Sequence, residues 1–271
     1  SNTNGKFVLK GTTDSLEALK YAGFNMLSLA NNHILDYYQE GLFDTMKILK
    51  ENDIAFSGVG SNLEEARKPA IIEKKGLKIG LLSYTDFADI VYAGNPRISF
   101  AAGENKAGVA PRKYEYLKED ISSVKDEVDI LMVSLHWGVE ESFEILPKQV
   151  ELAHELIDSG VDVILGHHPH QFQGIEVYKG KPIFYSLGNF IFDQNDPENQ
   201  ESFIVNMEFT GTKLTAISAA PVRTIGKVQV TPVFGDDAKE LLEREIELSS
   251  KLGTDFMIEN DRLVLSDIAD F

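Results

Sequence analysis

Five of the six histidines lie in three short polar segments, and each segment directly follows an apolar run of strand length. The runs and the segments that follow them are 26–30 before Asn31-Asn32-His33, 129–135 before His136, and 161–165 before Gly166-His167-His168-Pro169-His170. Helical patterns separate these runs, and buried strands that alternate with helices predict an α/β sheet whose outer face is covered. Residues at the carboxyl ends of such strands converge on one edge, where ligands bind. The sequence therefore predicts an α/β fold with its polar strand ends gathered together.

The pattern of elements changes after about residue 170. Before that point, the predicted helices are 39–52, with Leu42, Met46 and Leu49 at helical spacing, 63–67, 111–124 and 147–159. Further strands are predicted at 54–59, 70–73 and 77–82, and the last two flank Lys75-Gly76, which indicates a hairpin. Residues 86–110 lack periodicity and predict a long loop, which in a compact domain is often functional. Beyond residue 170, the segments 175–178, 183–187, 203–209 and 214–218 are separated by turn sequences and predict antiparallel hairpins. A charged helix over 236–252 and a short strand at 263–265 are predicted to follow.

Charge and composition exclude several classes of protein. The 271 residues are 43% hydrophobic, which is enough for a sizeable core in one large or two small domains. The net charge of −17 argues against binding to nucleic acid or to an anionic membrane, because no counterion release would favour it. The absence of cysteine excludes disulfides, thiolate metal sites and cysteine nucleophiles. Any metal must therefore be held by histidine, asparagine or carboxylates.

The polar strand ends offer a ligand set of that kind. His168 and His170 form a His-x-His pair that can aim two imidazoles at neighbouring metal ions, while Asn32 offers a neutral oxygen. Together with His136 this nitrogen and oxygen set suits Mn, Fe or Zn. Two such ions would clamp a phosphoryl group and lower the pKa of a bridging water. A single histidine at a strand end is usually a hydrogen-bonded loop residue. Bringing several such side chains together, buried and without hydrogen-bond partners, costs free energy, and this favours a metal site.

Two further histidines, His154 and His167, are predicted to lie outside the ligand set. His154 falls in the middle of a predicted helix beside charged residues, and we expect a surface position. His167 directly precedes the His-x-His pair and points away from it by strand alternation. A supporting or packing role is predicted for it.

Four segments together resemble the CapA family of bacterial capsule and poly-gamma-glutamate synthesis proteins, within the calcineurin-like metallophosphoesterase superfamily. The segments are Ser28–His33 with Asp36, His136-Trp137-Gly138 with Glu140, Gly166–His170, and Ser186-Leu187-Gly188-Asn189-Phe190. They occur in family order over about residues 6–225. The resemblance implies a single metallophosphoesterase-like domain over 6–271, built as a layered α/β/β/α sandwich of two sheets with helices outside. Residues 236–271 would form a C-terminal helical extension packed on it.

The resemblance also implies roles for individual residues. Two divalent metal ions (Mn, Fe or Zn) would be held by Asn32, His136, His168 and His170. His33 would donate a proton to the leaving group or hold a phosphate oxygen, and Asp36 would orient it. The substrate pocket would be lined or supported by Asn31, Trp137, Glu140 and Asn189. For the last three of these, a purely structural role stays open, because Trp packs readily and Asn stabilises turns.

The sequence departs from the family pattern at its beginning. The family opens with a strand that ends in Gly-Asp, followed by an Asn-x-Glu segment. Both come before the family segment that Lys6–Gly11 resembles, and neither is present in this sequence. The missing carboxylate would be a metal ligand, so its absence leaves a mostly neutral ligand set. We expect these residues to lie upstream of the sequence given, since a sheet without that strand would expose an apolar edge.

Three functional hypotheses follow. The first is a metal-dependent phosphoesterase that acts in the synthesis or export of an anionic cell-surface polymer, with the polymer or a phosphoester as substrate and membrane polymer-synthase subunits as partners. The second is a non-catalytic binding or scaffold component of such a complex. The third is a structural α/β domain with fortuitous histidines. The resemblance implies an extracytoplasmic location, at the cell surface or anchored to the membrane through a segment absent from this chain.

Overall fold

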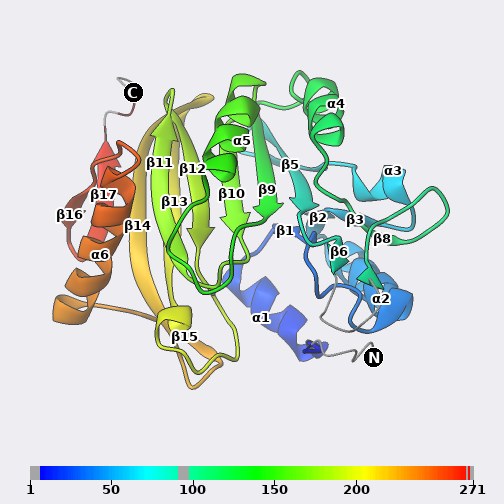
Figure 1. Ribbon diagram of the computed structural model, residues 1–271, viewed down its shortest axis with the longest axis horizontal. Coiled ribbons are helices and arrows are strands. Elements are labelled where there is room, and N and C mark those ends of the chain that lie inside the picture. The colour runs from blue at the N-terminus through cyan, green and yellow to red at the C-terminus, as the bar shows by residue number, and fades with distance from the viewer. Residues whose placement is uncertain (1–6, 91–97, 267, 269–271) are drawn as a thin grey trace. The chain divides into compact units, whose positions relative to one another are not determined.

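The fold was analysed in a computed structural model that describes residues 7–90, 98–266 and 268. The chain divides into two compact units, Ser1–His136 and Trp137–Phe271. Both units combine helices with strands, which confirms the predicted α/β class (Figure 1). Across the described part of the chain, no helix is both long enough and apolar enough to span a membrane.

Among the described residues, the first element of the first unit is a helix and the last is a strand. Its helices are α1 (Asp14–Ala22), α2 (Tyr38–Glu51), α3 (Leu63–Ala66) and α4 (Tyr114–Val124). Its strands are β1 (Met26–Ser28), β2 (Ala55–Ser57), β3 (Val59–Gly60), β4 (Ala70–Lys74), β5 (Leu77–Thr85), β6 (Asp89–Ile90), β7 (Ile98–Ser99), β8 (Gly108–Val109) and β9 (Ile130–His136). The predicted loop over 86–110 contains three of these short strands, and its residues 91–97 lie outside the described part.

Parallel pairing aligns the main strands of the first unit. β1 pairs with β2, and β5 pairs with β9, in both cases in parallel, while β4 joins β5 in the predicted antiparallel hairpin. Helix α2 buries Leu42, Met46 and Leu49, the face predicted from their helical spacing. These side chains pack with Leu29 and Val59 into the core cluster on that side of the unit.

The predicted strand over 54–59 is broken in the structure at Gly58. This glycine has a φ of +93°, and β2 ends before it while β3 begins after it. A Cβ there would lie 2.6 Å from the Cβ of Ala30 and 2.9 Å from that of Ser83. Gly58 therefore allows the ends of β1, β2 and β5 to approach closely, and that tertiary contact has no signal in the local pattern.

The second unit contains two sheets and two α-helices among its described residues. Its elements are α5 (Pro147–Asp158), β10 (Val163–His167), β11 (Phe172–Tyr178), β12 (Lys181–Leu187), the 3₁₀ turn η1 (Glu198–Gln200), β13 (Glu201–Thr210), β14 (Lys213–Ile225), β15 (Gln229–Pro232), α6 (Gly235–Ser250), β16 (Met257–Glu259) and β17 (Arg262–Ser266). β12 lies between β10, which is parallel to it, and β11, which is antiparallel. The second sheet has the order β13-β14-β17-β16, with β15 also on β14 (Figure 1). The rings of Phe172 and Phe203 meet between the sheets, with centroids 5.0 Å apart.

Helix α6 covers strand β11 through side chains that bond to the strand backbone. The N–H of Ile175 donates to Glu245 Oε1 at 3.1 Å and to Ser249 Oγ at 2.9 Å. The N–H of Val177 donates to Thr254 Oγ1 at 2.8 Å. These side chains provide acceptors for backbone N–H groups of an outer strand, which would otherwise be unpaired. The segment 236–271, predicted as a helical extension, is thus helical only in its first part and then adds β16 and β17 to the second sheet.

Candidate functional site

The strand ends of the first unit lie at one edge. Thr85 at the end of β5 is the register partner of His136 at the end of β9. Ser57 at the end of β2 shares a 2.6 Å hydrogen bond with Ser83 of β5, and its carbonyl accepts from the N–H of Leu29 just after β1. The segments that follow β1 and β9 therefore begin at the same edge, as expected for parallel strands.

His33 is fixed by a buried carboxylate. Its Nδ1 lies 2.7 Å from Asp36 Oδ2, and the N–H of Leu9 donates to the same oxygen at 2.8 Å. Asp36 is only 1% exposed. Since an ionised carboxylate only accepts, the His33 ring places its hydrogen on Nδ1, which leaves Nε2 to accept or deliver a proton. Asn31 shapes this turn, because its Oδ1 accepts from the N–H of His33 at 2.8 Å.

The predicted metal ligands of the first unit are both largely buried. Asn32 is 9% exposed and His136 is 7% exposed. The imidazole of His136 packs edge-on against Phe87, with ring centroids 5.6 Å apart, and its carbonyl accepts from the N–H of Asp86 at 2.9 Å. His136 is thus held in place by both its backbone and its ring.

The loop with the His-x-His pair has a strained backbone. His168 has a φ of +108° and His170 a φ of +67°, in the region that residues with a Cβ rarely adopt. Hydrogen bonds from neighbouring loops fix three of the loop's carbonyl groups. They run from Trp137 N–H to His167 O at 3.0 Å, from Glu141 N–H to Pro169 O at 2.8 Å, and from Asn189 N–H to His170 O at 3.2 Å. Strain of this kind persists where the surroundings over-determine the backbone, and it is common in binding sites.

The two imidazoles of this loop have different partners. Their ring centroids are 6.1 Å apart. His168 Nε2 lies 3.8 Å from Glu140 Oε1, whereas His170 Nδ1 lies 3.0 Å from Asn189 Oδ1. No group of three or more His, Asp or Glu side chains placed to share a metal ion occurs among the described residues.

Trp137 is a packing residue in this geometry. It is 1% exposed, stacks on Tyr185 with ring centroids 5.9 Å apart, and donates through Nε1 to the Tyr185 carbonyl at 3.0 Å. Gly166 makes room for this contact, because a Cβ there would lie 1.9 Å from the Tyr185 oxygen and 2.5 Å from Trp137 Nε1. Of the two roles left open for Trp137, the structural one is supported by this burial.

The side chain of His154 is 29% exposed, and it makes contacts that the sequence did not predict. Its Nε2 lies 2.7 Å from Glu176 Oε1, and its ring stacks on Tyr178 at 3.8 Å between centroids. Tyr185 donates to the other oxygen of Glu176 at 2.7 Å. These contacts could not be predicted because β11 supplies both Glu176 and Tyr178, and no local pattern places them against α5. His167 ends β10, and burial lowers its pKa to about 4, so its ring is neutral near pH 7.

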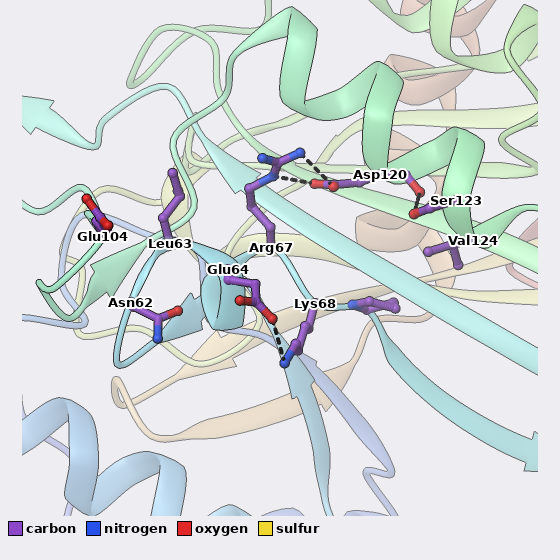
Figure 2. Close-up of a pocket in the computed structure, with 10 residues that line it drawn as sticks. Asn62, Leu63, Glu64, Arg67, Lys68, Glu104, Asp120, Ser123 and Val124 are labelled. Carbon is purple, nitrogen blue, oxygen red and sulfur yellow. Dashed lines mark hydrogen bonds and ion pairs between the residues drawn. The ribbon is translucent and has the colours of Figure 1, made fainter.

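A cavity of about 560 Å³ in the first unit is lined by none of the predicted site residues. Among the residues that line this cavity, Figure 2 shows Arg67 pointing at Asp120 and Glu64 pointing at Lys68. Arg67 donates to both oxygens of Asp120 at 2.9 and 2.8 Å, and Tyr84 donates to Asp120 at 2.5 Å. Because Arg67 pairs with Asp120 and Glu64 pairs with Lys68, we assign the cavity to the packing of α3 and α4 rather than to a ligand.

The two units thus define a mixed α/β protein whose strand-end loops carry buried and oriented histidines. Residues 1–194 match the family described as "Bacterial capsule synthesis protein PGA_cap". The chain belongs to this family.

Relatives with curated descriptions agree with this assignment. "Capsule biosynthesis protein CapA" of Bacillus anthracis is 31% identical over 94% of the chain, and "PGA biosynthesis protein CapA" of Bacillus subtilis (strain 168) is 34% identical over 86%. "Probable polyglutamine synthesis accessory protein Rv0574c" of Mycobacterium tuberculosis (strain ATCC 25618 / H37Rv) is 33% identical over 70% of the chain and 51% of its own length. The chain spans 61% and 59% of the lengths of the two Bacillus proteins.

Proposed function

We propose that this chain belongs to a metal-dependent phosphoesterase that acts in the synthesis or export of an anionic cell-surface polymer. The observation that carries the proposal is the pair formed by His33 and Asp36. A buried carboxylate that holds Nδ1–H of an imidazole leaves Nε2 available for proton transfer, which is the arrangement a general acid needs. The structural alternative, a hydrogen-bonded loop histidine, predicts no role in turnover.

The donor set of the chain fits divalent metal ions. We propose Asn32, His136, His168 and His170 as ligands for two ions of Mn, Fe or Zn, which prefer imidazole and oxygen donors. The fit rests on His170, whose Nδ1 is already engaged by Asn189, so that Nε2 is the nitrogen left to bind an ion. When bound, such ions polarise a phosphoryl oxygen and lower the pKa of a bound water.

The chain's own residues would then supply the remaining chemistry. His33, protonated on both ring nitrogens, would deliver its Nε2 proton to the oxygen of the leaving group and become the neutral Nδ1–H ring that Asp36 holds in place. Asn31 would shape the turn from which His33 projects. Glu140, whose side chain is 60% exposed beside His168, would contact the substrate or its surroundings from the solvent side.

The names of the relatives support the choice of polymer. Two are capsule or PGA biosynthesis proteins, so we propose a capsule or poly-gamma-glutamate polymer, or a phosphoester formed during its synthesis, as the substrate. Membrane polymer-synthase subunits would be the partners, at an extracytoplasmic site. The net charge of −17 opposes nonspecific adsorption of an anionic polymer, so recognition would depend on the metal site.

Hydrolysis of model phosphoesters tests the proposal. The purified protein is assayed with phosphomonoesters and phosphodiesters in the presence of Mn²⁺, Zn²⁺ or Fe²⁺, and metal content is measured in parallel. We expect metal-dependent turnover that His33→Ala reduces. Stoichiometric metal without turnover of any phosphoester would overturn the catalytic proposal.

The second candidate is a non-catalytic component of a polymer synthesis or export complex. It is favoured by the description of one relative as a synthesis accessory protein. It predicts that His33→Ala leaves polymer production in cells unchanged, whereas the phosphoesterase proposal predicts a loss. Polymer production by cells that carry His33→Ala therefore distinguishes the two candidates.

A further inference from the structure

Asn189, just after β12, contacts His170 with both its side chain and its main chain. Its Oδ1 lies 3.0 Å from His170 Nδ1, and its N–H donates to the His170 carbonyl at 3.2 Å. On its other side, Nδ2 donates to the carbonyl of Asn199 at 2.9 Å. The Asn189 amide therefore bridges the His170 ring and the turn η1.

The contact with Asn199 fixes which way the Asn189 amide faces. The Asn199 carbonyl only accepts, so the NH₂ group of Asn189 must face it, and a reversed amide would bring two acceptors to 2.9 Å. Oδ1 then faces the His170 ring. Because an amide oxygen also only accepts, the hydrogen of a neutral His170 ring must be on Nδ1, and the lone pair is on Nε2.

The group behind Asn189 is itself buried and held. Asn199 is 1% exposed, and its Nδ2 faces Gln194 Oε1 at 3.3 Å and Glu141 Oε1 at 3.4 Å. The backbone N–H of Glu141 in turn donates to Pro169, between the two histidines. Asn189, Asn199 and Glu141 together thus hold both the loop backbone and the ring of His170.

We propose that Asn189 is a positioning residue that sets the Nδ1–H tautomer of His170 and so presents Nε2 to a divalent metal ion. This differs from the substrate contact that the family resemblance implied for Asn189. The tautomer follows from the hydrogen bonds alone, and only its consequence for metal binding rests on the proposed function. Partners that orient a ligand histidine in this way typically change metal affinity about 10- to 100-fold when they are removed.

The test observes the tautomer directly in metal-free protein. Long-range ¹H–¹⁵N correlation spectra of ¹⁵N-histidine-labelled protein at about pH 8, above the ordinary imidazole pKa, distinguish Nδ1–H from Nε2–H, and His170→Ala assigns the signal. We expect Nδ1–H in the wild type. Asn189→Leu, which is similar in size but has no acceptor, should lose this preference. Asn206→Leu, on the exposed face of β13, is the matched control and should leave the tautomer unchanged.

Titration with Mn²⁺ supplies the second readout. Asn189→Leu should weaken Mn²⁺ binding about 10- to 100-fold, while Asn206→Leu should stay near the wild type. Nε2–H in the wild type, or Nδ1–H retained in a folded Asn189→Leu, would overturn the inference. If Asn189→Leu does not fold, Asn189→Ala, which also lacks the acceptor, replaces it in both measurements. A wild type that binds no metal but shows Nδ1–H would defeat the proposed metal chemistry and support the tautomer assignment.

Discussion

Asp36 holds His33 through the same oxygen that holds the N-terminal segment. Its Oδ2 lies 2.7 Å from His33 Nδ1 and 2.8 Å from the N–H of Leu9. A carboxylate in this position can orient an imidazole without exchanging its proton, as in catalytic triads. The burial of Asp36 strengthens both bonds, because little water competes for the oxygen.

His33→Ala should lower kcat for a phosphoester by about 10²–10⁴, the usual contribution of a general acid. Metal content should stay unchanged, since His33 is not among the proposed ligands. Asp36→Asn should act in the same direction, because an amide can no longer serve as a charged acceptor for the ring. Asp44→Asn, on the exposed face of α2, is the control and should retain full activity. An active His33→Ala enzyme would remove His33 from the mechanism.

His168→Ala should lower the bound Mn or Zn measured by elemental analysis, and should lower turnover in proportion. Losing one imidazole from an ion's coordination shell weakens binding more than losing a supporting partner does. The control is His154→Ala, because that imidazole bonds to Glu176 and lies outside the proposed ligand set. Equal metal content in the wild type and His168→Ala would favour a structural role for the histidine loop.

Gly166→Ala should destabilise the second unit by about 3 kcal/mol or more, beyond the usual cost of overpacking a core. The added Cβ would meet backbone oxygen and the Trp137 indole at contact distances that no small adjustment relieves. Gly211→Ala provides the comparison, because its φ is +61° but its Cβ would meet no atom within 4 Å. That variant should cost only the strain of the left-handed backbone, about 1 kcal/mol. Urea denaturation of the wild type and of both variants measures these changes in the free energy of unfolding.

The sequence was sufficient to predict features that depend on local pattern. Apolar runs that end at His136 or at the His-x-His loop predicted β9 and β10 to within two residues, because a buried strand needs a continuous apolar stretch. The face of α2 that carries Leu42 and Met46 followed from helical spacing alone. Candidate ligands could be named from the same strand ends, since polar residues there have few structural reasons to gather.

Features that depend on contacts distant in sequence could not be predicted. The break at Gly58 reflects its approach to Ala30 and Ser83, and the network of His154 depends on Glu176 of another strand. The left-handed backbone of His168 and His170 is likewise imposed by bonds from neighbouring loops. Propensity would assign neither histidine such a backbone, so only tertiary structure reveals it.

Glu245→Gln should remove a pH dependence of stability in the second unit. Burial raises the pKa of Glu245 to about 8 from an ordinary value of 4.5, so the folded protein keeps a proton that the unfolded chain releases between these values. The contribution of protonated Glu245 to the free energy of unfolding is therefore fully present below about pH 4.5. It falls as the pH rises toward 8, by up to about 1.4 kcal/mol per pH unit. Glutamine resembles the protonated acid and still accepts from Ile175, so it should match the wild type at low pH and exceed it at pH 8.

Trp137 gives a probe for this experiment, because it is the only tryptophan of the chain and lies buried in the same unit as Glu245. Urea unfolding followed by its fluorescence at several pH values should show a steeper decline for the wild type than for Glu245→Gln. Glu243→Gln, on the solvent side of α6, is the matched control and should keep the wild-type slope. Parallel curves for the wild type and Glu245→Gln would mean that Glu245 is ionised in the folded protein, with its charge stabilised by Ser249 and the Ile175 N–H.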